Sequence, residues 1–392
     1  MTKDNLHKVK NHISKRTIIH AASFASAYGG NFIASLRALD SVLQKQGWTF
    51  ILALPSAAAE RDWCAKLIAQ GYNVRFLPDC GSIWQFTLAL SSIAFSSEAT
   101  IIHTHFSQYD VAAWATKWIL RLKCRHLHVI WHAHSDFPVQ MTLLRRVRNI
   151  LKYRIMGHSV RMIAVSEHLR EQMIKAGFRP KGIRTVQNGI ALDRAVALTR
   201  SRAQVFEEYS LSKHNRLLLL FGWEPTVKGV DIAIDACKIL IDLGLEVVLG
   251  IVGTSTLKDF VSSRTANAIP AWLRILPPIE DVASYYQIAS VFVSASRCEG
   301  FPYSIGEAMV NRLPVVLSDL PGVTWARETP GALFFPSGDC VAMAAAIREV
   351  LGWSAEERVK RAVANENLVR SQFAVSTWAE RISHLYLETM QE

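Results

Sequence analysis

The chain has 392 residues, which at roughly 150 residues per domain is enough for two or three domains. Half of the residues are hydrophobic and 20% are charged, a composition that excludes a disordered chain. The 44 Lys and Arg residues against 33 Asp and Glu leave a net charge of +11, which favours anionic partners such as nucleotides, nucleic acid or anionic lipid.

The six cysteines are far apart and form no Cys-x-x-Cys pair, which is typical of reduced thiols. The polar, basic start of the chain leads into no signal-peptide core, so we expect a cytoplasmic protein. The longest uncharged stretch, 80–97, is too polar to span a bilayer, and any membrane contact should therefore be peripheral.

Short apolar runs alternate with amphipathic stretches through the first half of the chain. This alternation is typical of a doubly wound parallel sheet with helices on both faces. The predicted strands are 17–23, 49–54, 74–78, 100–105, 126–132, 161–166 and 183–189, and the predicted helices are 30–46, 59–70, 111–122 and 141–153.

The strand rhythm stops at 191–215, which we interpret as a linker, and a second alternation follows. Its predicted strands are 216–222, 246–253, 273–277, 290–296 and 313–319, and the chain ends in helices that include 376–390. The sequence therefore predicts an α/β protein with two Rossmann-like domains. Ligands bind such sheets at the carboxyl ends of the strands, so two domains that face each other would form a cleft there.

Gly29 and Gly30 follow the first predicted strand and open a helix. A glycine turn lets a ligand approach the backbone closely, and the free N–H groups of a helix N-terminus favour an anion. The alternative is a plain turn in which Asn31 caps the helix.

The segment 296–309 carries Glu299 in a loop and Glu307 one turn into a helix, so both carboxylates can face the same cleft. Carboxylates at such positions suit the hydroxyls of a sugar and a ribose. The alternative is structural, because Ser304 and Glu307 have the spacing of a capping box.

Four histidines, His126, His128, His132 and His134, share even parity and would lie on one face of a strand. A zinc site is a poor interpretation, because a strand spreads these positions too widely for one tetrahedral ion. His132 on its own could equally be a core histidine. The sequence contains no Walker loop, no dinucleotide fingerprint and no Asp-x-Asp pair.

The segment EGFPYSIGEAM followed by NRLPVVLSDLPG resembles the signature of retaining GT-B glycosyltransferases of family 4, which includes bacterial capsule, exopolysaccharide and lipopolysaccharide hexosyltransferases. The resemblance extends in order over Gly29–Gly30, the HTH of 103–105, the WHAH of 131–134, the IAVS and VQNG ending at 166 and 189, and the FGWEPTVKG of 221–229. It implies a GT-B fold of two Rossmann-like domains facing across a cleft, with an acceptor domain at 1–196, a nucleotide-sugar domain at 197–373 and a returning helix at 374–392.

The resemblance also implies a role for individual residues. Glu307 would hold the ribose, Glu299 the donor sugar and Lys228 the diphosphate, and His132 would reach the sugar from the acceptor domain. The implied catalytic residues are His132, Lys228 and Glu299. The implied donor-binding residues are Gly29, Gly30, Lys228, Pro277, Ile279, Glu299, Gly300, Phe301, Pro302, Tyr303, Ser304 and Glu307.

One position departs from the family pattern. Family members carry Arg directly after the glycine that ends the first strand of the second domain, but here Trp223 follows Gly222. Tryptophan cannot bind phosphate by charge, and Arg297 is a nearby candidate substitute.

The implied function is retaining transfer of a hexose from a UDP- or GDP-linked sugar to a hydroxyl of a glycan or lipid-linked acceptor. The departing phosphate would take the acceptor proton, and we expect neither a cofactor nor a metal. A nucleotide-sugar epimerase of the same fold, or a non-catalytic sugar-nucleotide-binding subunit of a polysaccharide assembly complex, is the alternative.

The segment 137–166 contains six Lys and Arg residues, no acidic residue and an interleaved apolar stripe. Residues 141–161 could therefore rest on an anionic membrane surface or hold a lipid diphosphate. A solvated face over an ordinary core stripe is the alternative. We expect no nucleic-acid partner, because the basic charge is not part of any recognised binding module.

Overall fold

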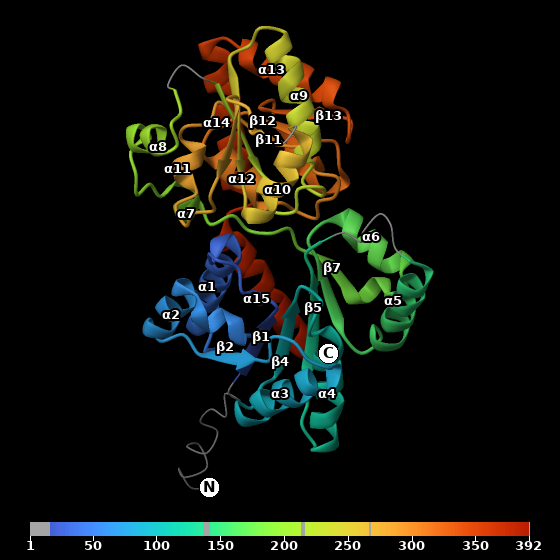
Figure 1. Cartoon of the computed structure of the whole chain (residues 1–392). Helices are drawn as coiled ribbons and strands as arrows, with labels where there is room; N and C mark the ends of the chain where they lie inside the picture. The colour runs from blue at the N-terminus through green and yellow to red at the C-terminus, as the bar shows by residue number, and fades with distance from the viewer. Residues whose placement is uncertain (1–15, 136–141, 213–215, 266–267, 392) are drawn as a thin grey trace, which may run out of the picture.

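The computed structural model describes residues 16–135, 142–212, 216–265 and 268–391, and it contains two α/β domains, one above the other in Figure 1. In these residues the first domain has a seven-stranded sheet of order β3-β2-β1-β4-β5-β6-β7, and the second a six-stranded sheet of order β10-β9-β8-β11-β12-β13. Every pairing is parallel. The two Rossmann-like sheets predicted from the alternation are confirmed.

The first domain contains the strands β1 (Arg16–Ala22), β2 (Trp48–Pro55), β3 (Val74–Leu77), β4 (Ile101–His105), β5 (His128–Ala133), β6 (Arg161–Ala164) and β7 (Ile183–Thr185). Its helices are α1 (Gly30–Lys45), α2 (Asp62–Ala69), α3 (Ile83–Ser96), α4 (Asp110–Leu122), α5 (Leu143–Met156) and α6 (Glu167–Lys175), with short 3₁₀ helices η2 (Ser56–Glu60) and η3 (Pro180–Gly182).

The second domain contains the strands β8 (Arg216–Phe221), β9 (Val247–Val252), β10 (Leu273–Leu276), β11 (Val291–Ser294), β12 (Val315–Ser318) and β13 (Ala332–Phe335). Its helices are α9 (Val230–Asp242), α10 (Ser255–Arg264), α11 (Ala283–Tyr286), α12 (Tyr303–Val310), α13 (Cys340–Gly352) and α14 (Ala355–Gln372), with the 3₁₀ helix η4 (Pro321–Glu328).

The central strands are apolar on both faces because helices cover both sides of each sheet. In β8, for example, Leu217 to Leu220 are each at most 1% exposed. A strand buried on both faces reads as a continuous apolar run, which is why these strands were visible in the sequence.

The connection between the sheets is more structured than the predicted linker. Two short helices, α7 (Leu192–Val196) and α8 (Arg202–Glu208), lie within 191–215. These helices lie between β7 and β8, so the segment connects the two sheets as predicted, and part of it is helical. Ser201 and Gln204 form a capping box that starts α8, a local signal that the mixed polar composition obscured.

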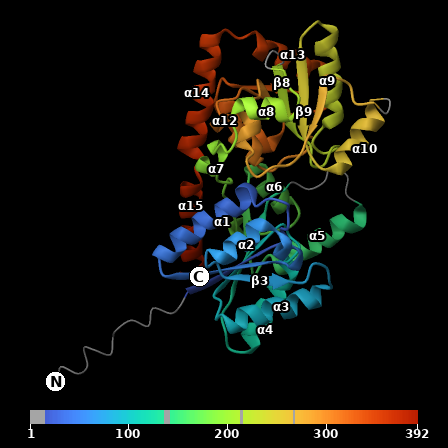
Figure 2. The ribbon, with the colours of Figure 1, turned by 60° about the vertical axis from the view of Figure 1, so that its left-hand side comes forward.

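The last helix, α15 (Val375–Gln391), leaves the second domain and packs along α1 of the first (Figure 2). At the crossing, Ile190 and the returning chain exchange backbone hydrogen bonds: Ile190 N–H donates to Phe373 O at 2.7 Å and Val375 N–H donates to Ile190 O at 3.0 Å. The two chain crossings between the domains are thus joined side by side.

The basic segment forms α5, while residues 137–141 of that prediction lie outside the described residues. The face of α5 is unusually apolar for a surface helix, with Leu143 and Leu144 each nearly 80% exposed. Within the described residues, no helix is both long and apolar enough to cross a membrane.

Candidate functional site

A cavity of about 470 Å³, here called the interdomain cavity, lies where the carboxyl ends of the two sheets face each other. Loops after β1, β4 and β5 line one wall, and the loops after β8 and β11 together with the start of α12 line the other. Ten of the predicted donor-binding residues line it: Gly29, Gly30, Lys228, Ile279, Glu299, Phe301, Pro302, Tyr303, Ser304 and Glu307.

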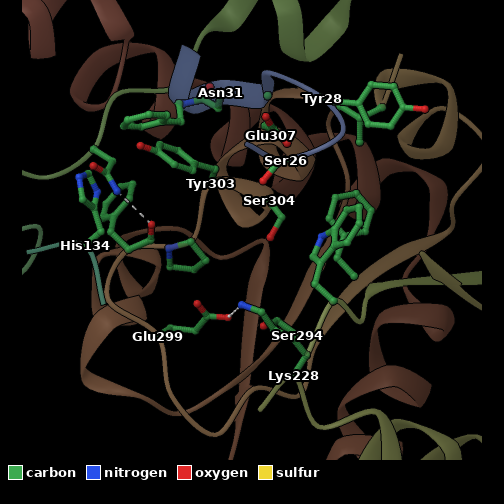
Figure 3. A pocket seen from close by; sticks show the side chains of 18 of the residues that line it. Ser26, Tyr28, Asn31, His134, Lys228, Ser294, Glu299, Tyr303, Ser304 and Glu307 are labelled. Atoms are coloured by element: carbon green, nitrogen blue, oxygen red, sulfur yellow. Dashed lines mark hydrogen bonds and ion pairs between the residues drawn. The ribbon is translucent and has the colours of Figure 1, made fainter. Parts of the chain in front are cut away.

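Lys228 and Glu299 meet on the floor of this cavity (Figure 3). The lysine Nζ donates to Glu299 Oε1 at 2.7 Å, and Ser296 Oγ donates to the same oxygen at 2.7 Å. Glycine follows the lysine of necessity, since Gly229 has φ +65° and a Cβ there would lie 1.9 Å from Ala295 O. The tight turn between β8 and α9 therefore holds Lys228 against the loop that carries Glu299.

Arg297 does not fill the place of the missing family arginine. Its guanidinium forms a two-pronged ion pair with Asp231, at 2.9 and 2.7 Å, and also donates to Thr226 O. Arg297 does not line the interdomain cavity, so the candidate substitution is wrong. Arg297 instead fixes the loop before Glu299 to the first turn of α9 through Asp231 and to the loop before Lys228 through Thr226 O. Trp223 lines the cavity and is 44% exposed.

Glu307 is buried at 5% exposure on the first turns of α12. The capping-box interpretation is wrong: Pro302 is the N-cap residue, and no side chain caps this helix. One carboxylate oxygen of Glu307 accepts from Arg194 at 2.5 Å, and the other accepts from Tyr286 Oη at 3.1 Å. Burial raises the pKa of the Glu307 carboxyl, and the neighbouring Arg194 guanidinium opposes that shift.

The start of α1 lines the cavity on the side of the first domain. Gly30 has φ +58°, a conformation that other residues rarely adopt. The expected cap is wrong, because the N-cap is Gly29, and the buried Asn31 side chain instead bonds Gly189 O at 2.6 Å and Ala191 N–H at 2.8 Å. The N-termini of α1 and α12 both open onto the cavity, and their unpaired backbone N–H groups make two positions that favour an anion.

Three predicted residues lie elsewhere. Pro277 does not line the cavity, and its carbonyl accepts from Tyr285 Oη at 2.7 Å. Gly300 does not line the cavity either, and a Cβ at this position would lie 2.5 Å from His134 O. His132 is buried at 2% and lines a different cavity.

That second cavity, of about 720 Å³, lies within the first domain between the ends of β4 and β5 and the helix α5. Phe106, His134 and Ser135 line both cavities, so the two spaces meet at these residues. Lys152 of α5 lines the second cavity and pairs with Asp110 at 2.8 Å.

The four histidines of equal parity do not gather as a set. His126 precedes β5, which begins at His128. His132 and His134 instead join His103 on the neighbouring strand, because parallel pairing places β4 beside β5. His105 of β4 and His20 of β1 complete this group.

Sequence reasoning missed several residues of the interdomain cavity. His134 and Asn188 were inside the quoted WHAH and VQNG motifs but were given no role. Arg194, the cavity cation opposite Lys228, had no sequence signal at all, because it follows the first sheet in a short helix of the expected linker.

Two family models match the chain in consecutive segments. The model described as "Glycosyltransferase Family 4" matches residues 34–194, and "Glycosyl transferases group 1" matches residues 215–352. Each match therefore covers most of one of the two domains.

Curated relatives agree with these models. The chain is 25% identical over 288 residues to a Bacillus subtilis (strain 168) protein named "Putative teichuronic acid biosynthesis glycosyltransferase TuaC", covering 73% of this chain and 70% of that protein. It is 24% identical over 198 residues to an "Uncharacterized glycosyltransferase" of Haemophilus influenzae, covering 50% and 52% of the two chains.

Solved structures share the fold. A glycosyltransferase from Rickettsia africae ESF-5 superposes with a TM-score of 0.79 at 15% identity, covering 97% of this chain and all of that one. Anabaena HepE in complex with UDP-glucose gives 0.78 at 15% identity over 95% and 99%, and WaaG, a glycosyltransferase involved in lipopolysaccharide biosynthesis, gives 0.70 at 14% over 94% and 99%. With both domains matched in sequence and in fold, the chain belongs to glycosyltransferase family 4 and has the GT-B architecture.

Proposed function

We propose that this protein is a retaining transferase that moves a hexose from a UDP- or GDP-linked donor to a hydroxyl of a glycan or lipid-linked acceptor in bacterial surface polysaccharide synthesis. The observation that carries the proposal is the Lys228–Glu299 pair at the meeting point of the two sheets, with two helix N-termini facing it. The TuaC relative and the UDP-glucose complex of HepE support the class of reaction and of donor.

The proposed diphosphate site uses the positive groups of the cavity. Lys228 is the side-chain cation nearest to Glu299, and the N–H groups at the starts of α1 and α12 add fixed partial positive charge. These groups would stabilise the negative charge that develops on the leaving phosphate without needing to reorganise.

The proposed sugar and ribose contacts use the two carboxylates. Glu299, beside the lysine, would accept hydrogen bonds from donor-sugar hydroxyls, and Glu307 from the ribose. Glu307 already pairs with Arg194 and Tyr286, so a ribose would share or replace those partners. The sugar would react on the face from which the phosphate leaves, and the departing phosphate would take the proton of the acceptor hydroxyl, with no resident metal or cofactor in the reaction.

We propose the second cavity as the acceptor site, because it adjoins the interdomain cavity and lies beside the apolar face of α5. Its rim carries both kinds of group that a lipid-linked acceptor needs. Exposed apolar side chains of α3 and α5 that line it, including Ile83 at 56% and Ile155 at 63%, suit acyl chains, while Arg148 suits anionic head groups. We propose a cytoplasmic enzyme that rests peripherally on the membrane through this face.

The transfer proposal is tested by incubating the purified protein with a panel of UDP- and GDP-hexoses. We expect one donor to be hydrolysed slowly without acceptor, and ¹H NMR during the first turnovers to show that the released sugar keeps the anomeric configuration of the donor. Release with inverted configuration would contradict the retaining mechanism. Binding of a donor without any turnover would favour the non-catalytic subunit, and a changed sugar still joined to its nucleotide would favour the epimerase.

The membrane proposal is tested with the double variant Arg146→Gln/Arg148→Gln and sedimentation with phosphatidylglycerol-containing liposomes. Each cation near an anionic surface contributes about 1 kcal/mol, so the partition coefficient should fall about thirtyfold. Arg348→Gln/Lys360→Gln removes two exposed cations from helices of the second domain and is the matched control. Equal effects of the two double variants would contradict binding through α5.

A further inference from the structure

Four buried histidines, one half-buried histidine and one buried tyrosine form a continuous chain of hydrogen bonds behind the second cavity. His132 Nδ1 lies 3.2 Å from His103 Nε2, and His103 Nδ1 lies 2.6 Å from the hydroxyl of Tyr386. The same hydroxyl lies 3.4 Å from His20 Nε2, whose ring continues the chain.

The other half of the chain runs from His20 back to the cavity. His20 Nδ1 lies 3.1 Å from His105 Nε2, and His105 Nδ1 lies 3.0 Å from His134 Nε2. The rings of His134 and His132 then stack at 4.0 Å, so the chain begins and ends at one place. We call these six residues, His20, His103, His105, His132, His134 and Tyr386, the histidine network.

Burial keeps the five imidazoles neutral. His20, His103 and His105 are fully buried, and His132 is 2% exposed. Burial lowers the pKa of His20 and of His134 to about 3, and it lowers the pKa values of His103, His105 and His132 far below the usual range.

A neutral imidazole has one N–H donor and one bare nitrogen, and a tyrosine hydroxyl can donate only one hydrogen bond. Each imidazole between two partners must therefore donate on one side and accept on the other. The Tyr386 hydroxyl does the same, because its O–H has no acceptor other than His103 and His20 among the described residues. If His132 Nδ1–H donates to His103, every following link must run in the same direction, and all five rings carry hydrogen on Nδ1. In the opposite direction all five rings carry hydrogen on Nε2.

The two directions present opposite hydrogen-bonding groups to the second cavity. In the first, His132 presents a bare Nε2 and His134 presents Nδ1–H; in the second, each nitrogen has the reverse character. Both histidines line the second cavity, but His132 Nε2 itself is covered and has no hydrogen-bond partner in the described residues, so a ligand hydroxyl would reach it only after the side chains over it move. An unpartnered acceptor is tolerated better than an unpartnered N–H, so the Nδ1–H direction should be the resting one.

We propose that the histidine network is a linked tautomer switch, joined through Tyr386 of α15, that presents one hydrogen-bond acceptor and one donor together to a hydroxyl-bearing ligand in the second cavity. This deepens the proposed function, since on that function the ligand is the acceptor and its hydroxyl donates to His132. Reversal takes up one proton at His132 Nε2, releases one at His134 Nδ1 and shifts one proton along each of the five links. The charge of the network does not change.

In this arrangement Tyr386, His20, His103 and His105 are positioning residues, since they act on a ligand only through His132 and His134. The alternative use of the same cluster is a metal, because the ligand atoms of His105, His132 and His134 lie within 4.8 Å of one another. A metal on His105 would replace one of its two hydrogen bonds, so the switch and a metal site are exclusive.

The test is the tautomeric state of each histidine, measured by long-range ¹H–¹⁵N correlation spectra of the ¹⁵N-histidine-labelled full chain at neutral pH. We expect all five rings to be neutral and to carry hydrogen on Nδ1, although Nε2–H is the commoner form of free histidine. Mixed tautomers among the five, a charged imidazolium, or one equivalent of tightly bound zinc in the purified protein would overturn the proposal. This measurement needs no substrate, so it is independent of the proposed function.

Tyr386→Phe removes the hydroxyl that links His103 to His20 and keeps the aromatic ring. The Nδ1–H of His103 would then face a phenyl ring, while the other form leaves an unpartnered N–H on His132 Nε2. The His103–His132 pair should therefore lose its preference and show both tautomers, whereas His20, His105 and His134 should keep Nδ1–H. Ser383→Ala is the matched control: it removes another buried hydroxyl of α15, which donates to Gln46 Oε1 at 2.8 Å, and should leave all five tautomers unchanged. Wild-type tautomers in the folded Tyr386→Phe variant would overturn the linkage, and the wild-type spectra decide the question if that variant does not fold.

Discussion

Lys228→Ala should reduce turnover more severely than loss of one phosphate cation usually does. Trp223 stands where the family has a phosphate-binding arginine, Arg297 is held by Asp231, and Arg194 is held by Glu307. Among the described residues, Arg194 and Lys228 are the lysine and arginine side chains that line the interdomain cavity, and Lys228 is the one assigned to the diphosphate because it is paired with Glu299, the carboxylate proposed for the reacting sugar.

The magnitude follows from the position of the lysine. A unit cation about 4 Å from a phosphate charge contributes about 4 kcal/mol at an effective dielectric constant of 20. The Lys228 side chain is 26% exposed, so solvent screens part of this interaction. We expect a net loss of about 3 kcal/mol of transition-state stabilisation, which is a hundredfold or greater fall in kcat/KM.

The assay is steady-state release of nucleoside diphosphate from the donor identified in the panel, with calorimetric titration of the same nucleoside diphosphate. Thermal unfolding is measured in parallel, because the substitution also leaves the Glu299 carboxylate, 10% exposed, with Ser296 as its remaining hydrogen-bond partner among the described residues. Near-normal turnover of a folded Lys228→Ala protein would refute the assignment of this loop to the diphosphate.

Two further variants test the same assignment of the diphosphate-binding cation. Arg297→Ala should keep kcat/KM within a few fold, because the guanidinium lies outside the cavity and acts on loop position. Trp223→Arg should fold, since the Trp223 side chain is 44% exposed, and should tighten binding of the nucleoside diphosphate. If Arg297→Ala were as damaging as Lys228→Ala, then Arg297 would be a phosphate ligand after all.

Glu307→Gln should weaken binding of the nucleoside diphosphate in calorimetry, whereas Glu299→Gln should mainly lower kcat, because the first is assigned to ribose and the second to the reacting sugar; equal kinetics for wild type and both variants would contradict both roles. Excess EDTA should leave turnover unchanged, and a complete loss that added metal restores would contradict a metal-independent reaction. Asn31→Ala should lower the free energy of unfolding by about 2 kcal/mol, because it leaves the buried Gly189 carbonyl and Ala191 N–H without their partner, and an unchanged denaturant midpoint would contradict this.

The sequence by itself indicated the loops that carry the site and every strand except β13. A strand buried on both faces appears in the sequence as an apolar run, and the carboxyl ends of parallel strands lie at the same edge of their sheet. Lys228, Glu299 and Glu307 each follow such a strand, so their arrival at one cavity could be predicted from position alone.

The partners of these residues were decided by the tertiary structure. Ser304 and Glu307 have capping-box spacing, yet the helix starts at Tyr303 and Glu307 turns to Arg194, 113 positions away. Local spacing gives the possible partners of a side chain, whereas the free energy of burying a carboxylate selects a cation that only the fold brings near.

The histidine network shows the same division most clearly. Strand parity predicted that His132 and His134 share a face, because side chains alternate along every strand. The strand order then added His103 and His105 from β4 and His20 from β1, and the return of α15 added Tyr386, which is 366 positions from His20. Periodicity is a local property of the chain, but which strands become neighbours depends on the packing of whole elements, and so the hydrogen bonds between these rings exist only in the folded molecule.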